Sequence, residues 1–250
     1  MLKIIKFNIL HFLRYFYLIK FNKFEIEIEI LDNLIEKNDI CFDIGACHGS
    51  YSRILAKYCK RVYAFEAEKD NYNYLKTVMR QKNIKIFNFA VSNKNGFSNL
   101  YVPVVNFKKN TAMSSLFYNY SRNKDSLSEG PKRLISQKVK TISLDTFVKK
   151  NKIKSINFIK IDVEGLELQI LTKSKIILKE LRPIFMIEIL KNHKKDHEKV
   201  FKFMKKYNYF SFYLKRKSKK LFRCSYKDIN KFQSQKLRSL KNKNFFDQNY

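Results

Sequence analysis

The chain has 250 residues, 45% of them hydrophobic, so it can bury a sizeable core, and its composition argues against wholesale disorder. Lysine and arginine number 52 against 22 aspartate and glutamate, which gives a formal net charge of +30. This charge favours polyanionic partners: nucleic acid, anionic lipid or a phosphorylated glycan. A biased genome composition is the favoured explanation for most of the charge, because Lys, Asn, Ile, Phe and Tyr are abundant while Gly, Pro and Trp are scarce.

The four cysteines exclude one class of site. Cys41, Cys47, Cys59 and Cys224 form no C-x-x-C pair and have no matching set of histidines, so no structural zinc site is predicted. Reduced thiols in a cytoplasmic protein are the expectation. The N-terminal segment 1–24 is interrupted by lysines and an arginine and lacks a small-residue cleavage site, which argues against a signal peptide and a membrane span.

Basic and large apolar residues alternate at helical spacing over 1–24, which predicts an amphipathic helix. Two interpretations stay open for this helix. It either packs on the main domain, which we favour, or lies on a membrane surface with its basic residues toward the headgroups. The following stretch, "FEIEIEILDNLI", alternates like a strand at its start and then continues into a helix. We therefore treat 1–38 as an N-terminal helix and lead-in.

From residue 39 onward, short apolar runs alternate with helical stretches. This rhythm predicts a doubly wound α/β domain over 39–225 with a parallel sheet and crossover helices. Expected strands are "DICFDIG", "RVYAFEA", "IKIFNFAVS", "SINFIKIDVEG", "RPIFMIEI" and the pair "YFSFYL" and "LFRCS"; expected helices are "GSYSRILAKYC", "KDNYNYLKTVMRQK", "LELQILTKSKIILKEL" and "DHEKVFKFMKKY".

Two segments lie outside this rhythm. Residues 93–141 begin with a stretch that favours a hairpin and continue as a polar, turn-rich segment, which is typical of a functional or disordered loop. Residues 226–250 form a basic, polar tail with room for one more helix.

The stretch "DIGACHG" connects the first expected strand to its helix, where ligands bind in open α/β sheets. Gly45 and Gly49 allow close approach of the backbone to a ligand, but their spacing differs from the G-x-G-x-x-G of dinucleotide binders. Glu66 ends the next strand and is placed to accept hydrogen bonds from ribose hydroxyls. With Asp43 before the glycines, the acidic pair suits a cationic nucleoside, and we predict S-adenosylmethionine as the cofactor.

Residues from 39 to about 190 resemble the FkbM family of S-adenosylmethionine-dependent methyltransferases. The resemblance rests on "DIGACHGSYS", "FEA", "FNFAVSNKNG" with Ala90 as a further cofactor contact, "TISLDTF", "INFIKIDVEGLELQIL" and "RPIFMIEI". It departs from the family where Cys47 replaces the usual Asn and Ala67 a common Pro. The resemblance implies a Rossmann-like, seven-stranded class I methyltransferase sheet and methyl transfer to an oxygen, often of a sugar or natural product.

Candidate catalytic residues follow the later strands, because methyl transfer requires alignment of a nucleophile and removal of one proton. Asp162 is the first candidate for the base and Glu164 the second, with a helix N-terminal carboxylate as the alternative for Glu164. Glu188 ends the next strand, and His193 follows it. Lys160 is expected to pair with a neighbouring acid. Mg²⁺ at the two strand-end carboxylates is allowed but not favoured, and no metal ligand is assigned.

Three functions remain open from the sequence. The leading one is an O-methyltransferase acting on a sugar hydroxyl in a surface glycan or its precursor, located in the cytoplasm, with peripheral membrane contact through 1–24 left open. The +30 charge favours an RNA 2′-O-methyltransferase as the alternative. The third is a non-catalytic module that binds a polyanion or a membrane. The methyl acceptor and the oligomeric state are not predicted.

Overall fold

The structure is a computed structural model, and it describes residues 26–105, 107–118, 133–189, 194–215, 218, 220–225 and 243–247. The expected N-terminal helix over 1–24, most of the segment 226–250 and the candidate His193 lie outside the described residues.

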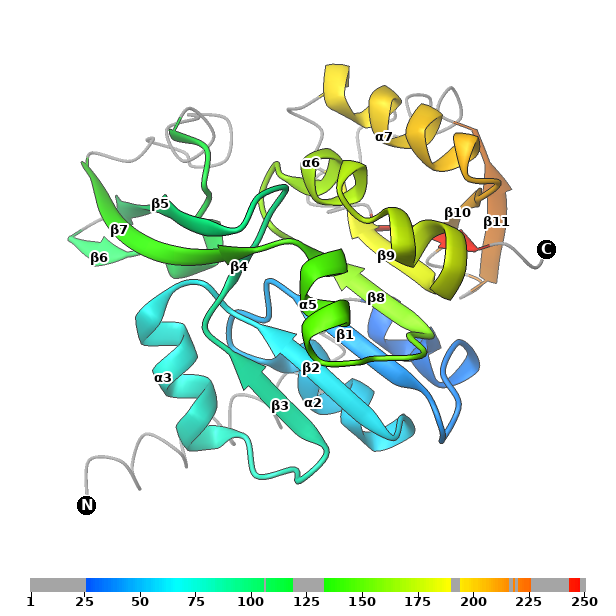
Figure 1. The fold of residues 1–250 in the computed structure, drawn as a ribbon, viewed down its shortest axis with the longest axis horizontal. Helices are drawn as coiled ribbons and strands as arrows, with labels where there is room; N and C mark the ends of the chain where they lie inside the picture. Colours follow the sequence, from blue (N-terminus) through cyan, green and yellow to red (C-terminus); the bar gives the residue numbers. More distant parts are fainter. Residues whose placement is uncertain are drawn as a thin grey trace.

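The central sheet has eight described strands, in the order β11-β10-β12-β9-β8-β1-β2-β3 (Figure 1). Strands β3, β2, β1, β8 and β9 are parallel neighbours, while β12 is antiparallel to β9 and β10, and β11 is antiparallel to β10. The mostly parallel sheet agrees with the expected α/β class, but the count of seven strands is not confirmed. The strand bounds are β1 (Ile40–Ile44), β2 (Arg61–Phe65), β3 (Ile84–Phe87), β8 (Phe158–Ile161), β9 (Ile184–Glu188), β10 (Phe210–Lys215), β11 (Lys220–Cys224) and β12 (Lys243–Asp247).

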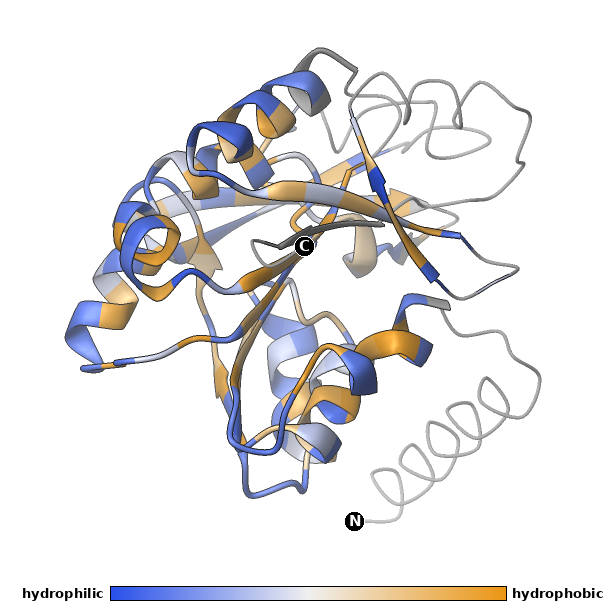
Figure 2. Cartoon of the chain, turned by 90° about the vertical axis from the view of Figure 1, so that its right-hand side faces the viewer, coloured by the Kyte–Doolittle hydropathy of each residue, from blue (hydrophilic) through white to orange (hydrophobic). Residues whose placement is uncertain are grey.

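Helices cover both faces of this sheet, as a doubly wound fold requires (Figure 1). One face carries η1 (Ile26–Asn33), α2 (Ser50–Tyr58) and α3 (Lys69–Val78). The other carries α5 (Leu144–Lys150), α6 (Glu167–Thr172), the π-helical η4 (Ile177–Leu181) and α7 (Lys194–Lys206). Figure 2 shows hydrophobic residues concentrated in the strands between these layers and hydrophilic residues toward the loops. The core therefore lies on both faces of the sheet, between its strands and the helices that cover them.

A second sheet crosses the carboxyl edge of the first, where the sequence predicted only a hairpin and a loop (Figure 1). Its order is β4-β7-β5-β6, with β4 (Ala90–Val91), β5 (Gly96–Val105), β6 (Lys108–Lys109) and β7 (Arg133–Ile142). The long antiparallel pairing of β5 with β7 is its main contact. The stretch expected to favour a hairpin forms β5, whereas β7 lies where a loop was expected, because β5 and β7 pair across a long stretch of chain that local pattern does not reveal.

Three more expectations change in detail. The predicted strand "IKIFNFAVS" divides into β3 and β4, and between them the Asn88 side chain donates to the carbonyls of Glu66 and Ala67. The strand-like start of "IEIEILDN" is a 3₁₀ helix, η1, because its Ile30 and Leu31 pack together against α2 rather than alternating across a sheet. The predicted single helix after β8 is two, α6 and η4.

The segment expected as a C-terminal tail contributes a strand. Residues 243–247 form β12, which pairs with β9 on one side and β10 on the other. No helix is seen in the described part of this segment. A basic, polar composition concealed the strand, since its pairing partners lie far away in the sequence.

Candidate functional site

The turn between β1 and α2 is held close to the neighbouring strand ends. The N–H groups of Gly45 and Ala46 both donate to the carbonyl of Phe65, at 3.0 and 2.9 Å. Gly45 has φ +80°, and a β-carbon there would overlap the backbone carbonyl of Asp162. Glycine is thus required where this turn passes the end of β8.

Gly49 has a different neighbour. It precedes α2 with φ +79°, and a β-carbon there would overlap the side chains of Met79 and Leu75. The predicted role of Gly49 as a cofactor contact therefore gains no support from its position, because this glycine serves the packing of α2 on α3.

Glu66 follows β2 and is buried. Its Oε2 accepts a hydrogen bond from the N–H of Cys47 at 2.6 Å, and its Oε1 accepts one from the N–H of Glu68 at 2.8 Å. Burial raises the pKa of Glu66 to about 7, and these two backbone hydrogen bonds oppose the rise. A carboxylate oxygen can accept more than one hydrogen bond, so both oxygens retain capacity for a ligand's hydroxyls.

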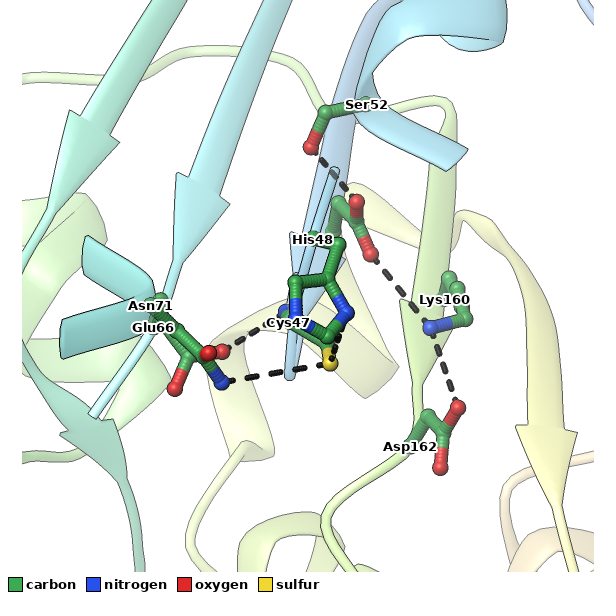
Figure 3. Close-up of polar contacts among 8 residues, drawn as sticks. Cys47, His48, Ser52, Glu66, Asn71, Lys160 and Asp162 are labelled. Atoms are coloured by element: carbon green, nitrogen blue, oxygen red, sulfur yellow. Dashed lines mark hydrogen bonds and ion pairs between the residues drawn. The ribbon is translucent and has the colours of Figure 1, made fainter. Parts of the chain in front are cut away.

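Three charged side chains and a serine form a row beside this turn (Figure 3). Ser52 Oγ donates to Asp43 Oδ2 at 2.5 Å, Asp43 Oδ1 lies 3.6 Å from Lys160 Nζ, and Lys160 Nζ lies 3.2 Å from Asp162 Oδ2. The Lys160 ammonium also lies 4.6 Å from the ring centroid of Tyr51. The expected pairing of Lys160 with an acid is confirmed, and two acids share it.

A pocket open to solvent lies at the carboxyl edge of the central sheet. Among the predicted residues, Gly45, Glu66, Ala90 and Asp162 line it. The second candidate base, Glu164, lines it as well.

Asp43 and Glu188 are placed differently from what the sequence predicted. Asp43 is 0% exposed and is not among the residues that line the pocket, so its contribution passes through Lys160. Glu188 is buried at the end of β9 and also does not line the pocket. Strand register puts Ile187 beside Ile161, and these residues immediately precede Glu188 and Asp162 in the chain.

The opposite wall of the pocket comes from the second sheet and from η2 (Thr111–Met113). Hydrogen bonds tie this wall to the main sheet: Ser115 Oγ donates to the Glu164 carbonyl at 2.8 Å, and Gln137 Nε2 donates to Glu68 Oε1 at 2.8 Å. Besides Ala90 and Val91 of β4, this wall supplies two leucines and four small or hydroxyl-bearing residues: Leu100, Thr111, Ala112, Ser114, Ser115 and Leu116. The sequence did not reveal this wall, because the polar, turn-rich pattern of the region predicts a loop.

Glu164 has backbone strain at the pocket. Its φ is +54°, in the left-handed region that non-glycine residues rarely occupy, and the residue is buried. Strained residues of this kind cluster at ligand sites. Close by, burial raises the pKa of Glu167 to about 7, while its Oε1 accepts a hydrogen bond from the N–H of Gly165 at 3.0 Å.

In the part of the chain that the structure describes, no group of three or more His, Cys, Asp or Glu side chains is arranged to hold a metal ion. None of the helices there has the length and apolarity needed to cross a membrane.

The sequence matches the model of one protein family, the methyltransferase FkbM domain, over residues 43–211, more than half of the chain. A curated relative, "Uncharacterized protein MJ1452" from Methanocaldococcus jannaschii, is 32% identical over 72 residues, which cover 29% of this chain and 23% of the relative.

Solved structures include similar folds. The methyltransferase FkbM from Methylobacillus flagellatus KT matches with a TM-score of 0.52 and 14% identity, covering 84% of this chain and 43% of that chain. SMU.1697c from Streptococcus mutans, a putative methyltransferase solved in complex with SAH, matches with a TM-score of 0.48 and 12% identity over 88% of this chain and 94% of that chain. This chain thus spans less than half the length of the M. jannaschii and M. flagellatus proteins. At 14% identity, the M. flagellatus likeness shows the fold alone.

Proposed function

Because this chain belongs to the FkbM methyltransferase family, we propose that it is an S-adenosylmethionine-dependent O-methyltransferase. Its acceptor is a hydroxyl of a sugar in a surface glycan or its precursor. The observation that carries the proposal is the pocket at the carboxyl edge of the sheet, where Gly45, Glu66 and Asp162 meet. Open α/β sheets bind their ligands at this edge.

The residues present suit the cofactor. Glu66 holds a carboxylate at the end of β2, fixed by two backbone N–H groups, where it accepts hydrogen bonds from the two ribose hydroxyls. Glu66, Asp162 and Glu164 give the pocket an acidic lining that favours a cationic ligand. S-adenosylmethionine supplies a methyl group on a positively charged sulfonium.

The chain's own task is to position the acceptor and remove its proton. Asp162 lines the pocket with a side chain that is 21% exposed, so it is reachable by a bound hydroxyl while still fixed by Lys160. It accepts the hydroxyl proton as the general base. The wall formed by Thr111, Ser114 and Ser115 offers hydroxyl groups for hydrogen bonds to a polyhydroxyl acceptor.

The net charge of +30 keeps RNA 2′-O-methylation as the second candidate. The pocket argues against it. Among the described lining residues three are acidic, Glu66, Asp162 and Glu164, and none is lysine or arginine. A ribose 2′-hydroxyl brings its phosphates with it, and these would lie against carboxylates.

The test is transfer of a radiolabelled methyl group from S-adenosylmethionine to total surface carbohydrate and to total RNA, with the wild-type protein and Asp162→Asn compared. We expect label in the carbohydrate fraction with the wild type and a large loss with the variant. Label in RNA would favour the second candidate. Absence of cofactor binding in calorimetry would contradict the methyltransferase assignment itself.

A further inference from the structure

Lys160 belongs to a row of four side chains beside the pocket. It contacts Asp162, the member of the row that lines the pocket. The row runs from Ser52 on α2 through Asp43 on β1 and Lys160 on β8 to Asp162 (Figure 3). The side chains of Asp43 and Lys160 are 0% and 4% exposed, whereas that of Asp162 is 21% exposed. Only the last member lines the pocket.

Strand register explains how the row forms. Asp43 and Lys160 are cross-strand partners in the parallel pairing of β1 with β8. Asp162 is two residues beyond Lys160 and so lies on the same side of the sheet as Lys160. That side is covered by α2, whose Tyr51 ring faces the ammonium.

A buried row of charged side chains adds little net stability to a protein core. Buried ion pairs recover little more than their desolvation cost, and apolar side chains of the same volume are often at least as stabilising. Here two carboxylates share one ammonium, so the row carries an excess negative charge next to the pocket. The arrangement therefore calls for an explanation other than stability.

We propose that Lys160 is a positioning residue that keeps the Asp162 carboxylate ionised and fixed in one orientation at the pocket, with Asp43 and Ser52 holding Lys160 in place. Lys160 Nζ contacts Oδ2 of Asp162, and the other carboxylate oxygen points away from the ammonium (Figure 3). The meaning of this role for catalysis rests on the proposed function, since it is Asp162 that would accept the acceptor's proton.

Several ionisable groups surround Asp162. Lys160 is the cation in contact with its carboxylate. The other groups lie on β1, the β1–α2 turn, α2 and the β8–α6 connection with the start of α6, and they are the acids Asp43, Glu164 and Glu167 and the ionisable Cys47 and Tyr51. Removing Lys160 takes away the ammonium that contacts Asp162 and leaves these acids nearby. Both like charge and burial then favour the protonated carboxyl.

The experiment follows the side-chain carboxyl ¹³C resonance of Asp162 with pH in protein labelled at aspartate. The resonance is assigned by its absence in Asp162→Asn. In the wild type we expect Asp162 to stay ionised throughout pH 4 to 7. In Lys160→Met we expect its titration midpoint to rise by about 1 to 3 pH units, into this window. In Lys160→Arg, which retains the charge, we expect a midpoint close to that of the wild type.

Lys109→Met is the matched control. Lys109 Nζ pairs with Asp70 at 2.6 Å, and both side chains are more than a third exposed. This variant also removes one lysine from an ion pair, and the Asp162 midpoint should not move. If Lys160→Met is folded and Asp162 titrates as in the wild type, the proposal is wrong.

If Lys160→Met does not fold, the titration of Asp162 in the wild type tests the proposed role of Lys160 by itself. A midpoint at or above the ordinary aspartate value of about 3.9 would then overturn the proposal, and an ionised Asp162 at that pH supports it. The measurement uses neither cofactor nor acceptor. A titration result that contradicts the role of Lys160 would therefore not contradict the proposed methyl transfer. Equally, a protein that fails to bind cofactor would not contradict the role of Lys160.

Discussion

Glu66 is buried, and both of its oxygens accept backbone hydrogen bonds. Burial favours the neutral form, while the N–H groups of Cys47 and Glu68 favour the carboxylate. The balance puts its pKa at about 7, within the physiological range. At the scale of single residues, the site thus depends on how each acid's surroundings fix its charge.

Substitution of Glu66 tests its contact with the ribose. We expect Glu66→Ala to weaken S-adenosylmethionine binding by about 1 to 3 kcal/mol, because two hydrogen bonds to a charged acceptor are lost. Glu66→Gln should fall between the two, since it retains one acceptor oxygen. Isothermal titration calorimetry measures all three proteins, and equal affinities would show that Glu66 does not bind the ribose.

The raised pKa of Glu66 predicts pH-dependent cofactor binding. Ionised Glu66 accepts the ribose hydroxyls, and with a pKa of about 7 its ionised fraction rises about tenfold between pH 6 and pH 8. The affinity for S-adenosylhomocysteine should rise by a similar factor over this range. Glu66→Gln provides the control, because it retains every other titrating group of the protein and of the ligand. Identical pH profiles for the two proteins would contradict the prediction.

The same group links folding to pH in the opposite direction. Its folded pKa, about 7, lies above the ordinary value of 4.5, so the folded state binds more protons between these pH values. The contribution of Glu66 to the free energy of unfolding is therefore largest below pH 4.5 and is lost as pH rises through 7. Denaturant unfolding of the wild type and Glu66→Gln at pH 5 and 8 measures this difference.

Asp162 is assigned to chemistry rather than cofactor affinity. We expect Asp162→Asn to keep the affinity for S-adenosylmethionine within a few-fold and to lower turnover by on the order of a hundredfold or more, the usual loss when a general base is removed. The amide preserves shape, so no cavity explains the fall. A variant that loses affinity but keeps its rate at saturating cofactor would place Asp162 among the binding residues.

At the scale of elements, the site depends on how closely the β1–α2 turn approaches the end of β8. Gly45 allows this contact, because its φ of +80° and its missing β-carbon let it lie against the Asp162 carbonyl. Asp162 N–H in turn donates to the Ile44 carbonyl at 3.0 Å. The turn and the end of β8 therefore form one packed unit.

Gly45→Ala should disrupt this unit. We expect a loss of more than about 1 to 2 kcal/mol in the free energy of unfolding, since steric overlap with backbone adds to the ordinary cost of a left-handed alanine. Gly96→Ala is the control, because Gly96 also has a positive φ, +125°, but a β-carbon there meets nothing within 4 Å. Equal losses in denaturant unfolding would show that the close approach to Asp162 does not matter.

At the scale of the whole molecule, the two ends of the chain differ in how they join the fold. The described structure begins with η1, whose Ile30 and Leu31 belong to the core on the α2 face. Near the other end, β12 pairs with both β9 and β10 inside the central sheet. The C-terminal segment is therefore part of the sheet on which the site is built.

Two truncations compare these ends. Removing 1–24 should leave S-adenosylmethionine affinity within a few-fold, because the strand and helix rhythm of the cofactor site begins only at β1. Removing 226–250 should lower the denaturant midpoint, since β9 and β10 lose their shared partner and expose unpaired backbone groups. Calorimetry and urea unfolding measure the two effects, and a C-terminal truncation as stable as the full chain would contradict the role of β12.

The sequence by itself determined the elements that local periodicity specifies. The runs at β1, β2, β8 and β9 alternate with helical stretches, and this pattern alone predicts a doubly wound sheet. The switch-point rule then located Gly45, Glu66 and Asp162 at one edge, and all three line the pocket.

The tertiary structure alone decided what depends on pairing between distant segments. It joined β5 to β7 in a second sheet whose β4 and β5 contribute to the pocket wall, and it inserted β12 between β9 and β10. It also set Asp43 behind Lys160 instead of in the pocket, because the register of β1 on β8 makes these two residues neighbours. Hydrophobic pattern reports which face of an element is buried, whereas register and sheet order depend on which strand edges remain free once the rest has packed.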